Sequence, residues 1–265
     1  MNEVITTLLK LYNNEAFLQS DVISWASPVP FFGDISKSRI ATLGLNPSNR
    51  EFVDKNGDEL CGINKRFETL NSLKIKHWRG AQNLHLLKIE ESCNWYFLNN
   101  PYDSWFKKLD YLISGTGHSY YFPYGNACHL DLIPFATTAK WGNLQAQHKK
   151  LLQQISMDAL GLMLNISEIE LLVLNGQSVV DGLAKISNVS LQKKLLPRIC
   201  LNRNHGKQIE GYGYIGSVSH IGAIRLARPV KILGYNHNIQ SSFGISKNIQ
   251  VALRDWITQK TKTIL

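Results

Sequence analysis

The chain has 265 residues, of which 44% are hydrophobic and 18% are charged. That composition is typical of a soluble globular protein, and no apolar run reaches the length that spans a membrane. A formal net charge of +9 at pH 7 favours a polyanionic partner, with nucleic acid as the first candidate and an acidic protein as the second.

The length is enough for one large core, so we expect a single domain over residues 1–265. The first ten residues lack a cationic segment followed by an apolar core, which gives no sign of a secretory signal and makes the cytoplasm the default location. The four cysteines lie far apart with no C-x-x-C pair, which argues against a zinc ribbon and against a disulfide framework. We therefore predict no metal and no cofactor.

The first predicted element is an amphipathic helix at residues 4–18, where apolar positions recur every three or four residues. The run at residues 39–49 predicts a buried strand that stops in the turn Gly-Leu-Asn-Pro-Ser. Further patterns predict helices at residues 81–91, 103–113, 143–164 and 245–257, a helix that opens at Gly176, and strands at residues 126–135, 169–174 and 230–235. Strands that alternate with helices indicate a three-layer α/β/α sandwich with a central parallel sheet.

Asn46 stands where the strand at residues 39–49 turns. In an open α/β sheet, ligands bind beyond the carboxyl ends of the strands, and Pro47 favours an extended conformation for the residue before it. An amide on such a stiff corner can hold a water or a small ring in a fixed orientation. An ordinary Asn-Pro turn is the alternative.

Four short motifs, in this order along residues 39–257, resemble those of the uracil-DNA glycosylase superfamily. Gly-Leu-Asn-Pro-Ser at residues 44–48 is similar to its first motif, and the strand ending at Asp131 is similar to its second, with Asp where Asn is usual. The strand at residues 169–174 and the helix after it match the third. His237 matches the His of the last motif, with Asn238 where Pro is usual. Some branches of the superfamily carry an iron–sulfur cluster on four cysteines, but the cysteine spacing here differs.

The resemblance implies hydrolysis of an N-glycosidic bond, which needs a positioned water, a stabilised oxocarbenium-like sugar and help for the departing base. Asn46 would orient the water, although an amide, unlike an Asp, cannot remove its proton. His237 would donate a hydrogen bond to the base oxygen as negative charge develops there. A strand-end histidine bonded to the backbone is the alternative.

An enzyme that acts on a base inside a duplex must flip it into a pocket. The superfamily stacks a Phe on the flipped ring; Phe52 and Phe67 are candidates, and Phe52 is preferred because it is nearer to the first motif. Leu45, within that motif, is also assigned to the base pocket. The loop after the last strand is expected to contact phosphates and fill the vacated space, unless its side chains are merely solvated, through Asn238, Gln240, Ser241 and Ser242.

Base choice would depend on Asp131 and Ser48. Alternation along the strand places His129 and Asp131 on one face. In uracil-selective members an Asn at the Asp131 position donates to uracil O4, whereas a carboxylate accepts from an amino group such as cytosine N4. Those members also carry a Tyr, at the position of Ser48, that blocks groups on pyrimidine C5. The alternative is that Asp131 pairs with a Lys or Arg and does not read the base.

The resulting prediction is a monomeric DNA glycosylase resembling phage-defence enzymes of the superfamily. It would act on double-stranded DNA, excise a C5-modified cytosine such as glucosylated hydroxymethylcytosine of bacteriophage DNA, and leave an abasic site. Three alternatives stay open: a uracil or mismatch glycosylase of DNA repair, a nucleic-acid-binding module on the same fold without catalysis, and a hydrolase of free nucleosides or other small molecules. The net charge of +9 counts against the last.

Overall fold

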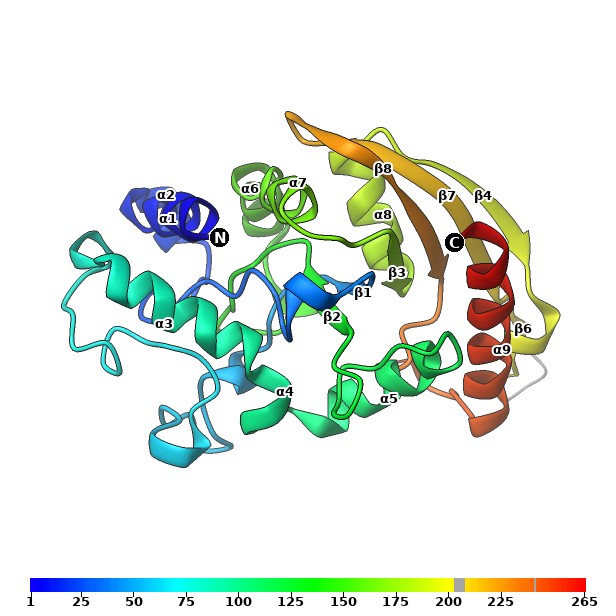
Figure 1. Cartoon of the computed structure of the whole chain (residues 1–265), viewed down its shortest axis with the longest axis horizontal. Helices are drawn as coiled ribbons and strands as arrows, with labels where there is room; N and C mark the ends of the chain where they lie inside the picture. The colour runs from blue at the N-terminus through cyan, green and yellow to red at the C-terminus, as the bar shows by residue number, and fades with distance from the viewer. Residues whose placement is uncertain (203–207, 241) are drawn as a thin grey trace.

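The computed structural model describes residues 1–202, 208–240 and 242–265. A six-stranded sheet in the order β2-β1-β3-β8-β7-β4 forms its centre, and β5 pairs with β6 separately (Figure 1). The strands are β1 (Ile40–Gly44), β2 (Ala127–Asp131), β3 (Leu171–Asn175), β4 (Ser190–Leu195), β5 (Leu201–Asn202), β6 (Gln208–Ile209), β7 (Tyr212–Ile221) and β8 (Ile224–Tyr235). The α-helices are α1 (Asn2–Lys10), α2 (Glu15–Leu18), α3 (Asn83–Asn94), α4 (Tyr96–Asn99), α5 (Asp103–Ser114), α6 (Ala146–Ile155), α7 (Ala159–Asn165), α8 (Gln177–Ile186) and α9 (Lys247–Ile264).

Strands β1, β2 and β3 are buried along their whole length. A strand without a solvent-facing side must have helices on both faces of its sheet. Helices α7 and α8 pack on one face, whereas α5 and α9 pack together on the other (Figure 1). The predicted α/β fold, with helices on both faces of a central sheet, is confirmed.

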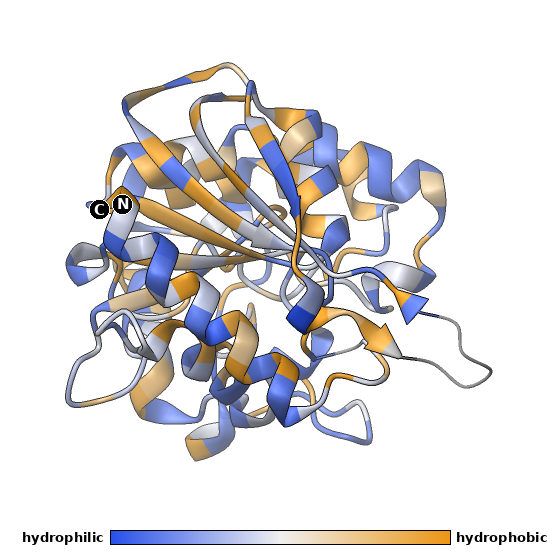
Figure 2. Cartoon of the chain, turned by 90° about the vertical axis from the view of Figure 1, so that its right-hand side faces the viewer, coloured by the Kyte–Doolittle hydropathy of each residue, from blue (hydrophilic) through white to orange (hydrophobic). Residues whose placement is uncertain are grey.

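The sheet is mostly parallel, so the predicted parallel sheet is confirmed in part, with two antiparallel strands as the correction. Strands β2, β1, β3 and β8 run parallel, but β7 is antiparallel to β8 and β4 is antiparallel to β7. The β7–β8 turn contains Gly222 at φ +55°, a left-handed conformation that favours glycine. Figure 2 faces this side of the molecule and shows polar and apolar residues intermixed along these strands. Most residues of β4 are exposed, as expected for an edge strand.

Two predicted helices are each divided, and one predicted strand is shorter. Residues 4–18 form α1 and α2, because the extended Asn14 caps α2 by accepting from the backbone N–H of Phe17. Residues 143–164 contain α6 and α7, separated near Ser156, whose hydroxyl bonds the Leu152 carbonyl. The strand expected at residues 126–135 ends at Asp131. Among the described helices, none combines the length and the apolar character needed to cross a membrane.

Candidate functional site

The four parallel strands end at one edge of the sheet, because parallel strands share their direction. Asn46 follows β1, Asp131 closes β2, Asn175 closes β3 and His237 follows β8. In the register of the sheet Gly44 pairs with Asp131, and Asn175 pairs with Tyr235. The predicted polar residues therefore do lie at the carboxyl ends of neighbouring strands.

Asn46 is held by the segment that follows β2. Its Nδ2 donates to the Phe135 carbonyl at 3.3 Å, to the Pro47 carbonyl at 3.1 Å and to Oγ1 of Thr137 at 3.1 Å. Carbonyl oxygens only accept, so the amide nitrogen must face them and Oδ1 must face away. Oδ1 accepts no hydrogen bond from the part of the chain that the structure describes. Asn46 thus joins the β1 and β2 loops and keeps one acceptor free.

A chain of buried polar side chains fixes Asp131. Nε2 of His129 lies 3.3 Å from Oδ1 of Asp131, and Nδ1 of His129 lies 2.6 Å from Oγ1 of Thr42. That hydroxyl is 2.5 Å from the hydroxyl of Tyr120. Nε2 of His129 therefore faces the Asp131 carboxylate while Nδ1 faces the Thr42 hydroxyl, so both ring nitrogens have a polar neighbour. Among the described residues, the ion-pair partner of Asp131 is His129 and not the Lys or Arg of the predicted alternative.

Gly44 makes room for this carboxylate. A Cβ atom at Gly44 would overlap Oδ1 of Asp131 and would lie 3.0 Å from Nε2 of His129. Both side chains therefore lie over Gly44, which confirms that His129 and Asp131 share a face. Any larger residue at this position would displace Asp131, so the glycine of the turn motif has a packing reason.

Sequence reasoning missed Glu51, which is 3% exposed. The 3-10 helix Asn49–Glu51 turns this side chain inward, and Oε2 accepts from the Tyr96 hydroxyl at 2.8 Å. Nε of Arg66 lies 3.9 Å from Oε2. Burial raises the pKa of Glu51 to about 7; the charge of Asp131 adds to this rise, while Tyr96 and Arg66 oppose it. Nothing in the polar stretch around Glu51 distinguishes it from a solvated surface residue.

The two candidate stacking residues are both in the core. Phe52 and Phe67 are each 1% exposed, and their ring centroids lie 5.7 Å apart. Phe67 stacks on Tyr96 with a centroid distance of 5.1 Å and an interplanar angle of 12°. Phe67 is therefore linked to Glu51 through Tyr96, whereas the preference for Phe52 rested on sequence distance alone.

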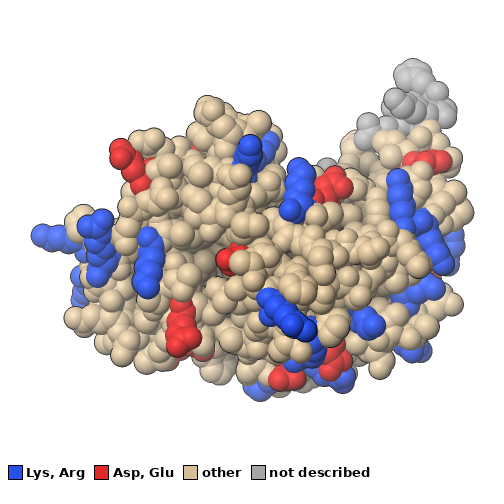
Figure 3. Space-filling model, turned by 90° about the horizontal axis from the view of Figure 1, so that it is seen from above, with Lys and Arg blue, Asp and Glu red and all other residues tan. Residues whose placement is uncertain are grey.

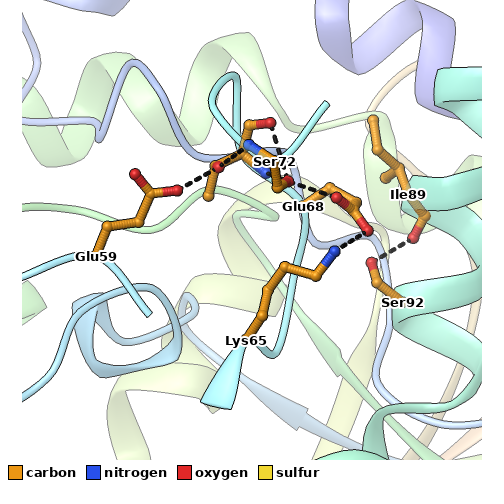
Figure 4. A network of polar contacts seen from close by, with 7 residues as sticks. Glu59, Lys65, Glu68, Ser72, Ile89 and Ser92 are labelled. Atoms are coloured by element: carbon orange, nitrogen blue, oxygen red, sulfur yellow. Dashed lines mark hydrogen bonds and ion pairs between the residues drawn. The ribbon is translucent and has the colours of Figure 1, made fainter. Parts of the chain in front are cut away.

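Hydrogen bonds fix the loop that carries Phe67 (Figure 4). Lys65 Nζ donates to Glu68 Oε1 at 2.6 Å, and Ser72 Oγ donates to Glu68 Oε2 at 2.5 Å. A hollow of about 260 Å³ opens beside this loop, and its lining contains none of the predicted site residues; it is formed by Glu59, Leu60, Cys61, Gly62, Lys65, Asn71 and Ser72.

His237 is 4% exposed and has one ring nitrogen without a partner. Its ring donates to the backbone carbonyl of Ile199, while Nε2 is buried and unpaired among the described residues. Burial lowers the pKa of His237, so the ring is mainly neutral at pH 7. With the proton on the nitrogen that faces Ile199, Nε2 carries a lone pair and accepts rather than donates. No hydrogen bond joins His237 to Asn46 or Asp131, all three of which are described.

Hydrogen bonds to β3, to α5 and within the loop fix the segment after β8. Nδ2 of Asn175 donates to Gln240 Oε1 at 2.7 Å, and Gln240 Nε2 donates to the Trp105 carbonyl at 3.3 Å. These two bonds hold the Gln240 side chain against β3 and α5, and its contact with phosphate stays a prediction. Asn238 Oδ1 accepts from the Gln240 backbone N–H at 3.0 Å, and the Asn238 backbone carbonyl accepts from the Ser242 backbone N–H at 2.9 Å. Ser241 lies outside the described residues.

Three further residues, two in the loop after β1 and one in the loop after β8, differ in how exposed they are. Ser48 is exposed, and its Oγ accepts from the backbone N–H of Arg50 at 3.2 Å, which caps the 3-10 helix of Glu51. Leu45 is half-buried, and its carbonyl accepts from Ile133 N–H at 2.9 Å. Phe243 was missed, although it is 80% exposed directly after the predicted DNA-binding residues. Its place directly after those residues was the sequence feature that could have identified Phe243 as a site residue.

All four cysteines are free thiols, and the described ranges contain no group of three or more His, Cys, Asp or Glu residues arranged to hold a metal. On the face shown in Figure 3, Lys and Arg side chains are spread over the surface with acidic side chains between them. A comparison with protein-family models and a comparison with curated proteins each found no match to this chain.

Proposed function

We propose that the chain is a DNA glycosylase similar to the uracil-DNA glycosylase superfamily, which flips and excises a C5-modified cytosine and leaves an abasic site. The observation that carries this proposal is the pair of oriented acceptors at the ends of β1 and β2: the free Oδ1 of Asn46 and the carboxylate of Asp131. Glucosylated hydroxymethylcytosine of phage DNA is the proposed substrate, and antiviral defence in the cytoplasm is the proposed setting.

Asn46 would orient the water that attacks the sugar. Its amide nitrogen is fully used by the loop after β2, so Oδ1 has a fixed direction in which to accept from that water. Asp131 would accept from the cytosine amino group through the oxygen that His129 leaves free. Ser48 is small, which leaves space for a substituent on C5.

Two aromatic residues support the flipping step. Phe243 is an exposed apolar side chain in the loop after β8, and such a side chain can insert between base pairs and fill the space of a flipped base. Phe67 could stack on the base, but it is buried, so the proposal requires its loop to open when DNA binds. For Nε2 of His237 to donate to the base, the ring must give up its bond to Ile199 and adopt the tautomer with the proton on Nε2.

The test is incubation with duplexes that contain one uracil, cytosine, hydroxymethylcytosine or glucosylated hydroxymethylcytosine, followed by mass spectrometry of the released bases. We expect release of the modified cytosine by the wild type and none by Asn46→Ala. Asn56→Ala, at an exposed turn, is the matched control. Release of uracil alone would identify a repair-type uracil glycosylase, and DNA binding without release of any base would identify a binding module. Either result overturns the proposal.

A further inference from the structure

We infer that Glu51 supplies the proton that the departing base needs, and that Glu51 and Asp131 together read the edge of a cytosine-type base. The inference rests on the proposed function and adds a second base-contacting carboxyl to it. It also assigns to Glu51 the donor role that the ring of His237, bonded to Ile199, does not fill in this structure.

The two carboxyls are attached to neighbouring parts of one aromatic cluster. Tyr96 holds Glu51 through its hydroxyl, and His129 holds Asp131 through Nε2. The ring of Phe32 contacts both of these partner rings, with centroid distances of 5.0 Å to Tyr96 and 5.3 Å to His129. Glu51 and Asp131 are 3% and 6% exposed, and the charge of Asp131 acts on Glu51.

Tyr96 and Arg66 oppose protonation of Glu51, whereas Asp131 favours it. The charged and titratable groups that act on it are Tyr96 from α4, Arg66 from the loop before α3, and Asp131 from β2. Arg66 is mostly engaged elsewhere, because it donates to the backbone carbonyls of Asn100 at 2.6 Å and Arg50 at 2.5 Å. With burial raising its pKa to about 7, Glu51 holds a proton in a large share of molecules at neutral pH.

One carboxyl that accepts and one carboxyl that donates match the edge of cytosine. Asp131 accepts from the amino group at N4, and a protonated Glu51 donates to the adjacent ring nitrogen N3. Uracil presents the reverse order, with an acceptor at O4 and a donor at N3. Oε2 of Glu51 is bonded to Tyr96, whereas Oε1 accepts no hydrogen bond within the described chain, so Oε1 can carry the proton toward the base.

In the proposed step the C1′–N1 bond breaks and its electron pair passes to the base. Glu51 transfers its proton to N3, so the base leaves as a neutral molecule and not as an anion. The water held by Asn46 adds to C1′, and the proton that this water loses returns through solvent to the Glu51 carboxylate. The sum is hydrolysis, and Glu51 ends as it began.

The test is the pH dependence of single-turnover release from the modified-cytosine duplex. We expect the wild-type rate to fall about tenfold per pH unit above a midpoint near 7, as for a general acid. Glu51→Gln keeps an acceptor for Tyr96 and can donate a hydrogen bond but cannot transfer a proton. We expect it to be about 100-fold slower at pH 6 or below, with no fall at higher pH. Glu168→Gln, whose side chain is 74% exposed, is the control.

Tyr96→Phe gives a second readout. Removing the hydroxyl that stabilises ionised Glu51 should move the midpoint to higher pH, which a purely structural role for Glu51 would not do. If the wild type and Glu168→Gln release base and Asn46→Ala does not, while Glu51→Gln keeps the wild-type rate and pH profile, the inference is wrong and the proposed function stands. If the wild type releases no base, both are wrong.

Discussion

Replacing Glu51 with Gln should change how the stability of the protein depends on pH. The pKa of Glu51 is raised from an ordinary value of 4.5 to about 7 in the folded protein. Between these values the unfolded chain binds fewer protons than the folded one, so the free energy of unfolding falls as the pH rises. The sign is opposite to that of a carboxylate stabilised by an ion pair.

The structure sets the size of the effect. The difference between 4.5 and about 7 corresponds to about 3 kcal/mol once the pH is above both values, at roughly 1.4 kcal/mol per pH unit. Solvent screens little of it, because Glu51 is 3% exposed. Gln has nearly the same shape, keeps an oxygen for the Tyr96 hydroxyl and cannot ionise, so it removes the pH-dependent cost and little else.

The assay is urea unfolding of the wild type, Glu51→Gln and the surface control Glu168→Gln at pH 5, 6, 7 and 8. We expect the free energy of unfolding of Glu51→Gln to gain about 2 to 3 kcal/mol over the wild type between pH 5 and pH 8. The control should follow the wild type at every pH. A difference between Glu51→Gln and the wild type that stays constant with pH would refute the burial argument, since it would mean that Glu51 titrates normally.

Other substitutions test the remaining parts of the site. Thr42→Val should lower the free energy of unfolding by about 1 to 3 kcal/mol, because it leaves the buried nitrogen of His129 unpaired, and Thr42→Ser should restore most of it in the same urea assay. Asp131→Asn should slow release of modified cytosine and admit uracil, measured on both duplexes; an unchanged preference would remove Asp131 from base reading. Ser48→Tyr should exclude glucosylated hydroxymethylcytosine while sparing cytosine, and equal loss on all bases would contradict an open C5 side. His237→Ala should slow release by less than about tenfold if Glu51 is the donor, whereas a loss of two or more orders of magnitude would return that role to His237.

The sequence by itself determined the parallel part of the sheet and the position of Asn46. Strands β1 and β3 are buried on both faces, so they appear as almost continuous apolar runs, whereas β2 was recognised from His129 and Asp131 alternating with apolar residues. Asn46 follows directly from such a run and from the proline after it. The antiparallel strand β4 was missed because its residues are mostly exposed and include two adjacent lysines, which gives no apolar alternation.

Only the tertiary structure decided what surrounds the strand ends. Glu51 is buried because Tyr96, 45 residues later, reaches its carboxylate, and Gln240 is engaged because Asn175, 65 residues earlier, binds it. The local sequence could not reveal either pair, because the residues around a polar loop position are the same whether its side chain faces solvent or a distant hydroxyl. The charge state of Glu51 depends on the same contacts, because desolvation and the field of Asp131 exist only once the loops have packed together.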